Sequence, residues 1–488
     1  MQRWFSCCLT AFFALGFLSC SPSPVAGVDA GASAPGLASP DLASTQPAPT
    51  IKIATGVYAV AGVTADDQVV LIDPVKSGAF AAPIGGGLMQ TVDPGAVIIA
   101  VEGKLVFAWS HVDQNGLGDV TRWSAAGGSV QLGVGSATRL FAVSDDGAFI
   151  AWSDGGAATV GDLRIARADG SHAMKVFSQV VLDDSCRPRL AFAAKSHRLI
   201  ASYCPKPGDG GAVSAVVSSV DGETGQVTDL KTPAEDFFSI DRTGGHVLVI
   251  SDTHVGDVVT VTGDHHQLLT QQMSAGYLLA GATEVVYQSN ANGNGSGALG
   301  RVLVNGGMAT PLVAGGVDRI EAISPDEGWL VYSTRRGMGT SSDLFLIGTR
   351  SGRVTTLSEN TRGGLRDDAF TADSSHVLYL TSVMASSAGT LRSQPVSGGP
   401  PVEHGTSVFN VRAALGTRVV FNDHYRPALQ SRGRADLYLV DTAKSDAPVL
   451  LAAAADVVFF LSANRDRVVY AVQDTPGTEG IFVTGLPQ

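Results

Sequence analysis

The chain has 488 residues, and its 33 Lys and Arg against 45 Asp and Glu give a formal net charge of −12. Such an acidic chain lacks the basic face that binding to nucleic acid requires. Because 44% of its residues are hydrophobic and only 16% are charged, it also differs from chains that stay disordered. Its 58 glycines, scattered between short runs of Val, Ile and Leu, favour many short strands joined by tight turns.

The N-terminal residues resemble the signal of an exported bacterial lipoprotein. Arg3 supplies a basic start, and the uncharged apolar run at residues 4–18 is too short to span a bilayer comfortably. The run ends at Ser19-Cys20, and a cysteine directly after a small residue is similar to the bacterial lipobox. This resemblance implies cleavage after Ser19 and lipidation of Cys20, which would anchor the protein to a membrane leaflet. An ordinary cleaved signal with an incidental cysteine is the alternative.

The next segment predicts a tether. Residues 21–50 contain six Pro, seven Ala and five Ser but only two charged residues, so they cannot bury enough apolar surface to fold. The predicted organisation is therefore a signal at 1–19, a lipidated cysteine with a disordered linker at 20–50, and a strand-rich body at 51–488. The predicted location is extracytoplasmic, on the outer membrane or the periplasmic face of a bacterial envelope.

The cysteines of the body predict a disulfide. Beyond Cys20 only Cys186 and Cys204 remain, and they flank two apolar runs around a turn near Lys195-Ser196. Paired residues of an antiparallel hairpin have a constant index sum, and the two cysteines are centred on residue 195. We therefore expect the thiols to face each other and to be joined outside the cytosol. Two separate buried thiols are the alternative.

One short apolar run recurs along the body, usually followed by a polar turn. Its copies lie 38 to 50 residues apart and begin at Val106, Phe149, Leu199, Val247, Val285, Leu330, Val377, Val419 and Val468. Each unit has further apolar runs separated by Gly or Asp turns, and an aspartate often opens the third run, as at Asp119, Asp162, Asp257, Asp343 and Asp436. Four short strands in about 45 residues are typical of a β-propeller blade.

Three of these units resemble the WD-like repeats of TolB-type propellers. Residues 324–333 read Ser-Pro-Asp-Glu-Gly-Trp-Leu-Val-Tyr-Ser and are followed by Asp343-Leu-Phe-Leu. Residues 144–153 and 371–380 are further copies. The resemblance implies the fold but not the activity, because such repeats occur in periplasmic scaffold proteins and in the non-catalytic halves of some peptidases.

We therefore predict an all-β chain that forms a single β-propeller of four-stranded blades. Eight units cover residues from about 92 to 452, and a ninth, from residue 456, shows about three strands. The prediction is eight or nine blades, within a range of seven to nine. Residues 57–84 fit no complete blade, but an N-terminal strand that completes the last blade would close the ring and remove its exposed edges.

Motifs for metals and catalysis are weak or missing. Residues 113–119 carry oxygen side chains at alternate positions, as a calcium loop does, but Leu117 and Ser124 stand where further ligands are expected. We interpret the recurring aspartate as a turn-closing side chain. His265-His266 are neighbours that a strand would point to opposite faces. With no zinc, nucleophile-elbow or P-loop motif, we predict no catalytic residues, no metal and no cofactor.

Several predicted loops carry Arg and aromatic side chains. If the blades are read in order, these residues fall on one face of three consecutive blades: Arg335, Arg336, Arg362, Arg366, His424, Tyr425, Arg426, Arg432 and Arg434. A basic and aromatic patch on an acidic protein is suited to docking an acidic partner or ligand. Arginines that merely solvate surface loops are the alternative.

These observations predict a non-catalytic, lipid-anchored extracytoplasmic propeller that acts as a protein–protein interaction or scaffold module at the cell envelope. Its predicted contacts are a protein or envelope component and, through the lipid alone, the membrane; nucleic acid is excluded. The alternative is a propeller enzyme of the lyase, lactonase or dehydrogenase type with a site in the central channel. Apolar first strands at residues 97–101 and 457–461 count against that alternative. A third reading is a propeller that only spaces or stiffens an envelope assembly.

Overall fold

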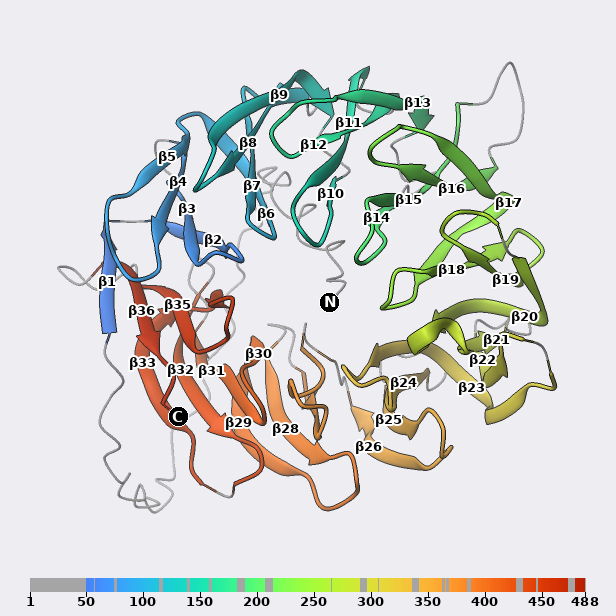
Figure 1. Cartoon of the computed structure of the whole chain (residues 1–488). Coiled ribbons are helices and arrows are strands. Elements are labelled where there is room, and N and C mark those ends of the chain that lie inside the picture. The colour runs from blue at the N-terminus through green and yellow to red at the C-terminus, as the bar shows by residue number, and fades with distance from the viewer. Residues whose placement is uncertain are drawn as a thin grey trace, which may run out of the picture. The chain divides into compact units, whose positions relative to one another are not determined.

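The computed structural model describes residues 50–56, 58–73, 77–113, 117–137, 141–157, 160–181, 189–206, 214–264, 266–289, 296–305, 307–335, 342–361, 365, 368–383, 388–426, 433–444, 446–472 and 479–487. These residues belong to one compact unit, Pro47–Gln488, and most of them are in β-strands (Figure 1). Their one helical element is the short 3-10 turn Ala280–Ala282. Within this part of the chain no helix has the length and apolarity to cross a membrane.

Antiparallel sheets follow one another along the chain. The first three have four strands each, β2–β5 (Ala59–Val63, Gln68–Ile72, Ala79–Pro83, Gln90–Asp93), β6–β9 (Ala96–Glu102, Leu105–Ser110, Leu117–Ser124, Gly128–Ala137) and β10–β13 (Phe141–Val143, Phe149–Ala157, Val160–Arg167, Met174–Val181). The last three are β27–β29 (His376–Thr381, Gly389–Pro395, Val402–Val408), β30–β33 (Val411–Ala413, Arg418–Arg426, Arg434–Asp441, Val449–Asp456) and β34–β36 (Phe459–Leu461, Arg467–Val472, Gly480–Gly485) joined by β1 (Thr50–Thr55).

A thirteen-stranded sheet, β14–β26, lies between these groups in the sequence. Its strands are Arg189–Phe192, Arg198–Tyr203, Ala215–Asp221, Val227–Ile240, His246–Ser251, Val255–Thr260, His266–Leu278, Glu284–Ser289, Gly297–Leu303, Thr310–Ile323, Trp329–Arg335, Ser342–Gly348 and Val354–Thr361. The long strands β17, β20 and β23 pair with the preceding strand through their first half and with the following strand through their second half. Each therefore ends one four-stranded unit and begins the next.

The predicted all-β propeller architecture with four-stranded units is confirmed by this pattern. One part of the prediction was wrong, namely the expectation that residues 57–84 fit no complete unit. Within this range Ala59–Val63, Gln68–Ile72 and Ala79–Pro83 are the first three strands of the complete sheet β2–β5. Its last two strands, Ala79–Pro83 and Gln90–Asp93, are rich in Ala and polar residues, so they lack the bulky apolar run that marks the other units. The number of blades in one ring stays a prediction.

The hydrophobic core is divided among the boundaries between consecutive units. One cluster joins Trp109 of β7 to Trp152 of β11, and the next joins Phe149 of β11 to Tyr203 of β15. The clusters draw side chains from two neighbouring units, including the successive units within the thirteen-stranded sheet, as expected when one face of each unit must be covered by the next. Figure 1 shows the sheets side by side in chain order. Each unit is therefore stabilised mainly by its two neighbours.

A Ser/Thr-x-Asp turn explains the repeat motif that resembles TolB-type propellers. Ser324 Oγ donates to Asp326 Oδ1 at 2.5 Å and accepts the Trp329 N–H at 3.0 Å. Ser144 makes the same pair of bonds with Asp146 and Phe149. The hydroxyl thus closes the turn between the first two strands of a unit, and the carboxylate fixes the hydroxyl.

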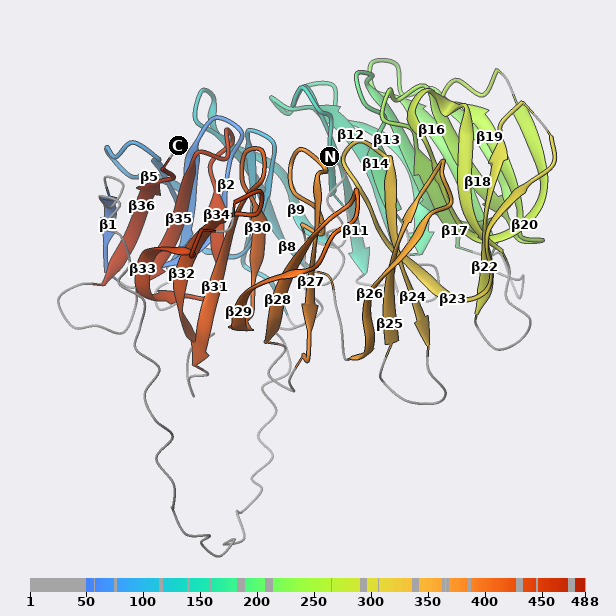
Figure 2. The same cartoon turned by 90° about the horizontal axis from the view of Figure 1, so that it is seen from below.

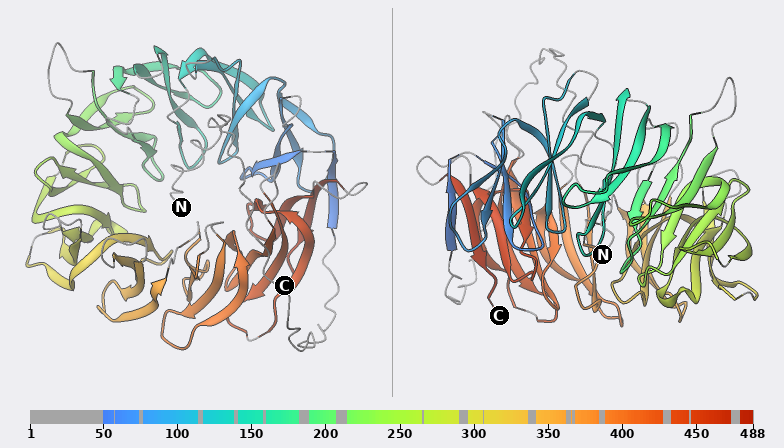
Figure 3. Two further views of the ribbon diagram at one scale, coloured as in Figure 1. Left: turned by 180° about the vertical axis from the view of Figure 1, so that it is seen from behind. Right: turned by 45° about the horizontal axis from the view of Figure 1, so that its top comes forward.

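The strand β1 joins the start of the described chain to its end. It pairs antiparallel with β36, with Thr50 opposite Thr484 and Thr55 opposite Gly480. Figure 3 shows this blue strand beside the red C-terminal strands. A buried cluster that includes Val69 of β3 and Val483 of β36 covers the same boundary. The last sheet is therefore completed by a strand from the other end of the body.

Candidate functional site

The strand ends that carry the predicted patch lie on one side of the sheets. Figure 2 shows the ends of β24, β27 and β31 pointing in the same direction. Arg335 is the last residue of β24, and 424–426 and Arg434 lie in the hairpin of β31 and β32. The remaining predicted residues lie outside the described part of the chain: Arg336, Arg362, Arg366 and Arg432. The structure therefore brings together the predicted residues of one hairpin.

That hairpin presents an ordered aromatic and cationic surface. Tyr425 stacks on Phe409, with ring centroids 5.1 Å apart. His424 adopts a left-handed backbone, φ 55°, and its Nδ1 lies 3.2 Å from Asp436 Oδ2. Arg426 is exposed and stands opposite Arg434 across the two strands. The hairpin therefore combines a stacked tyrosine with an exposed arginine at the next position of the chain.

The charge of this hairpin is mixed rather than purely basic. Asp436 accompanies His424, and Arg434 stands opposite Asp456 of β33. Asp423 is buried and accepts the backbone N–H groups of Ser407 and His424, both at 2.8 Å. The basic patch therefore stays a prediction, and in the described part of this hairpin acidic side chains accompany Arg426 and Arg434.

The recurring aspartate at the start of the third strand has a structural partner. Asp162 Oδ1 accepts the N–H of Gln179, and Asp436 Oδ1 accepts the N–H of Ala454, each at 3.0 Å. The two donors, Gln179 and Ala454, lie in the fourth strand of their units and have positive φ angles of 52° and 53°. The carboxylate thus stabilises a bulge of the fourth strand, not the turn that the sequence predicted.

The two motifs considered for metals have other surroundings. Asp119, at the end of the calcium-like segment, lies 3.1 Å from His111 Nδ1. His266 begins β20, and His265 lies outside the described residues. Among the side chains that the structure describes, no group of three or more His, Cys, Asp and Glu gathers in a way that could hold a metal ion.

The predicted disulfide is described at one end only. Cys204 is disulfide-bonded and buried, whereas Cys186 lies outside the described residues. The predicted turn is present, since Ser196 N–H bonds to Ala193 O, but the register differs by one position. Arg189 stands opposite Ser202, so the index sum is one greater than the sum for the two cysteines. The pairing of Cys186 with Cys204 stays a prediction.

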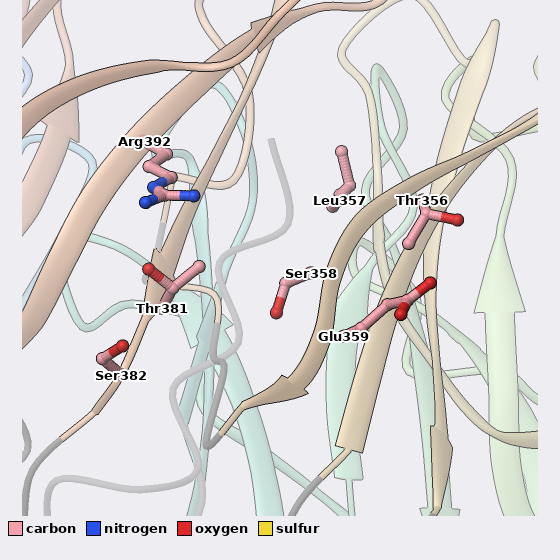
Figure 4. Close-up of a pocket in the computed structure, with 7 residues that line it drawn as sticks. All are labelled: Thr356, Leu357, Ser358, Glu359, Thr381, Ser382 and Arg392. Atoms are coloured by element: carbon pink, nitrogen blue, oxygen red, sulfur yellow. The ribbon is translucent and has the colours of Figure 1, made fainter.

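A pocket of about 340 Å³ lies near the same strand ends (Figure 4). It separates the edge strand β26 from β27 and β28 of the next sheet, and its lining residues are Thr356, Leu357, Ser358, Glu359, Thr381, Ser382 and Arg392. Figure 4 shows Arg392, Thr381 and Ser382 on one side and Ser358 on the other, whereas the carboxylate of Glu359 points away from the first three. The volume is at the lower end of the range for small-molecule sites. No sequence motif indicates this pocket, because its walls lie in two different units.

Arg392 is held in place by its neighbours in the sheet. Its Nη2 lies 3.3 Å from Glu403 Oε2, and it stands opposite Tyr379 of β27. The Nε of Arg392 and the hydroxyl of Tyr379 are both buried without a hydrogen-bond partner. Burial raises the pKa of Tyr379, which keeps its hydroxyl neutral. Polar groups therefore remain unsatisfied directly behind the pocket wall.

A histidine lies farther along the same sheet. His404 Nε2 and Ser393 Oγ are 2.7 Å apart. Burial, with a smaller contribution from the nearby His376, lowers the pKa of His404 to about 4. His404 is therefore neutral at neutral pH and makes its hydrogen bond in that form.

Comparisons with known proteins show the fold alone. No protein-family model matches the chain, and no curated protein matches it in sequence. Among solved structures, a eukaryotic initiation factor is similar, with a TM-score of 0.48 and 10% identity over 72% of this chain and 88% of that chain. An oligogalacturonate lyase in complex with manganese has a TM-score of 0.38 and 10% identity over 91% and 98%. A putative TolB from Agrobacterium tumefaciens has a TM-score of 0.29 and 14% identity over 57% and 100%.

Proposed function

We propose that this protein is a non-catalytic, lipid-anchored binding module at a bacterial cell envelope, with the β31–β32 hairpin as its main contact surface. The anchor is Cys20, and the 30 residues that follow it give the body room to reach a partner. The partner is a protein or an envelope component with an acidic surface.

The observation that carries the proposal is the ordered tip of the hairpin. Tyr425 stacks on Phe409, and the next residue of β31, Arg426, is exposed. Tyrosine and arginine are the residue types that dominate binding hot spots, because they combine large contact area with directed hydrogen bonds. Ordering such side chains before contact lowers the entropy cost of binding.

The test is affinity capture from cross-linked envelopes with the wild-type protein and with Tyr425→Ala plus Arg426→Glu. We expect the double variant to lose the captured partner, as should a variant with Arg335, Arg336, Arg426 and Arg432 changed to Glu. The matched control is Lys444→Glu, which reverses the charge of another exposed cation in the turn after β32. A partner that survives the double variant would contradict the proposed surface, and capture of no partner would favour the enzyme alternative.

The anchor is tested separately. Cys20→Ser removes the only thiol of the lipobox-like sequence, so we expect the protein to leave the membrane fraction and appear among soluble extracytoplasmic proteins. Cys7→Ser is the matched control, since it removes a thiol of the same signal region. Retention of the Cys20 variant in the membrane fraction would contradict lipid anchoring without bearing on the hairpin.

A further inference from the structure

The pocket between β26 and β27–β28 lies where its unit departs from the two flanking units. In β24–β25, Tyr332 stands opposite Phe345, and the two rings stack with centroids 5.1 Å apart. In β31–β32, Phe421 stacks on Tyr438 at 5.7 Å. At the same register position β27–β28 pairs Tyr379 with Arg392. A guanidinium that lines the pocket thus replaces an aromatic ring that would pack against the neighbouring strand.

The end of β27 departs from its neighbours in the same way. Two positions beyond the aromatic pair, Thr334 stands opposite Asp343 in one flanking unit and Asp423 opposite Asp436 in the other. In β27–β28 they are Thr381 with Thr390, so the recurring aspartate is a threonine. The next residue is Ser382, φ 53°, whereas His424, φ 55°, follows Asp423. Small hydroxyl side chains therefore replace a His–Asp pair at the mouth of the pocket.

The charges at the pocket disfavour an anionic ligand. Arg392 is already accompanied by Glu403, and Glu359 lines the opposite wall. Among the described lining residues Arg392 is the one cation, and its ion pair with Glu403 is formally neutral on a protein whose net charge is −12. An added carboxylate or phosphate would therefore meet no uncompensated cation among these residues.

The lining also disfavours a mainly apolar ligand. Among the lining residues that the structure describes, Leu357 is the one apolar side chain, whereas Thr356, Ser358, Thr381 and Ser382 carry hydroxyl groups. A hydroxyl both donates and accepts a hydrogen bond, and the guanidinium and the carboxylate add fixed donors and acceptors. Such a set matches a ligand that presents many hydroxyl groups.

We propose that this pocket binds a neutral polyhydroxylated ligand the size of one sugar residue. Arg392 and Thr381 hydrogen-bond its hydroxyl groups from one wall, and Ser358 does so from the other. The site is independent of the β31–β32 hairpin, so it adds a small-molecule ligand to the proposed partner-binding role.

The test is saturation-transfer NMR with glucose and N-acetylglucosamine, each at ~10 mM, a concentration that detects weak sites. We expect transfer from the wild-type protein to at least one sugar. Arg392→Tyr restores the residue type of the flanking units and fills the pocket, so it should fold and lower the transfer at least ten-fold. Thr381→Val, which keeps the side-chain shape but removes the hydroxyl, should also lower it.

The matched control is Arg164→Tyr. Arg164 holds the equivalent position opposite Trp152 in β11–β12, so this variant makes the same substitution in another unit and should leave the transfer unchanged. Absence of transfer to both sugars would overturn the proposal, as would transfer that Arg392→Tyr leaves intact. Stronger transfer to glutamate or displacement of the sugars by phosphate would show an anion site instead and would also overturn it. None of these outcomes depends on capture of a protein partner.

Discussion

At the scale of single residues, buried hydroxyl and imidazole groups set the local stability of the repeats. Ser324 is fully buried, and its hydroxyl satisfies both a carboxylate and a backbone N–H inside one turn. His404 is neutral and bonded to Ser393. In both cases a polar group inside the fold is tolerated because it has a partner, and removal of that partner leaves a desolvated donor or acceptor.

The turn hydroxyl gives the first prediction. Ser324→Ala leaves the Trp329 N–H without its acceptor, so we expect a loss of about 1–2 kcal/mol in the free energy of unfolding. Ser324→Thr should retain most of the stability, because Thr371 accepts the His376 N–H at 3.0 Å in the corresponding turn. Urea denaturation of the three proteins measures the difference. Equal stabilities of the alanine and threonine variants would contradict the role of the hydroxyl.

The pKa of His404 gives the second prediction. It is about 4 in the folded protein, below the ordinary value of 6.5, so below pH 6.5 the unfolded chain binds more protons than the folded one. The contribution of His404 is therefore fully present above pH 6.5 and is lost as the pH falls toward 4. Between pH 7 and pH 5 this amounts to at most about 2 kcal/mol. His404→Gln should remove that part of the pH dependence in urea titrations, and a variant with the wild-type pH dependence would contradict this role of His404.

At the scale of elements, the turns between first and second strands also connect neighbouring units. His197, next to the turn of the β14–β15 hairpin, lies 2.9 Å from Asp146 in the turn before β11. Ala463 N–H donates to Asp67 Oδ1 at 2.9 Å, which joins the last sheet to the first complete one. Gly244 lies very close to Ala194 of the preceding unit. A Cβ added at Gly244 would lie 1.9 Å from the Ala194 carbonyl oxygen, the shortest such distance among the described glycines.

A pair of glycine variants separates that contact from backbone strain. Gly147 and Gly244 have nearly the same positive φ, 73° and 75°, but a Cβ at Gly147 would meet no atom within 4 Å. Gly147→Ala should therefore cost about 1–2 kcal/mol, the strain of a left-handed alanine alone. Gly244→Ala should cost at least about 2 kcal/mol more, because the backbone of the neighbouring hairpin must move. Thermal denaturation of both variants tests this, and similar losses would show that the close approach has no energetic weight.

The sequence pattern predicted the strands of units that follow the repeat. It did not predict the features of units that depart from the repeat. The aspartates at 162 and 436 and the apolar second strands marked the units, since each pattern is local. The sheet β2–β5 was missed because Ala79–Pro83 offers small side chains in place of Val and Ile. The pocket was missed because Arg392 meets Ser358 only after two units pack together, and no local pattern encodes that contact. The tip of the β31–β32 hairpin was found because its Arg and Tyr side chains are adjacent in the sequence.

At the scale of the whole body, stability depends on each unit being covered by its neighbours. The cluster of Val69 and Val483 couples the first complete sheet to the last, and β1 pairs with β36 at the same boundary. Loss of β1 would uncover part of this cluster and leave β36 with unpaired backbone groups, an edge that favours association between chains.

A chain that starts at residue 57 tests this coupling against one that starts at residue 47. We expect the shorter chain to unfold at a temperature lower by several degrees and to form dimers or larger species in gel filtration. The longer chain serves as the control because it also lacks the segment ahead of the body but keeps β1. A shorter chain that stays monomeric and equally stable would show that β36 needs no partner.

The position of β1 also has a mechanical consequence. Any force on the body that is transmitted through the chain ahead of Thr50 acts first on the ladder of hydrogen bonds between β1 and β36. Those bonds, and the packing of Ile53 and Ala54 against the cluster beneath them, must yield before the pull reaches the β2–β5 sheet. The strand that completes the last sheet is thus also the joint that carries tension, and its rupture would release the ends of the body while the other units still hold one another in place.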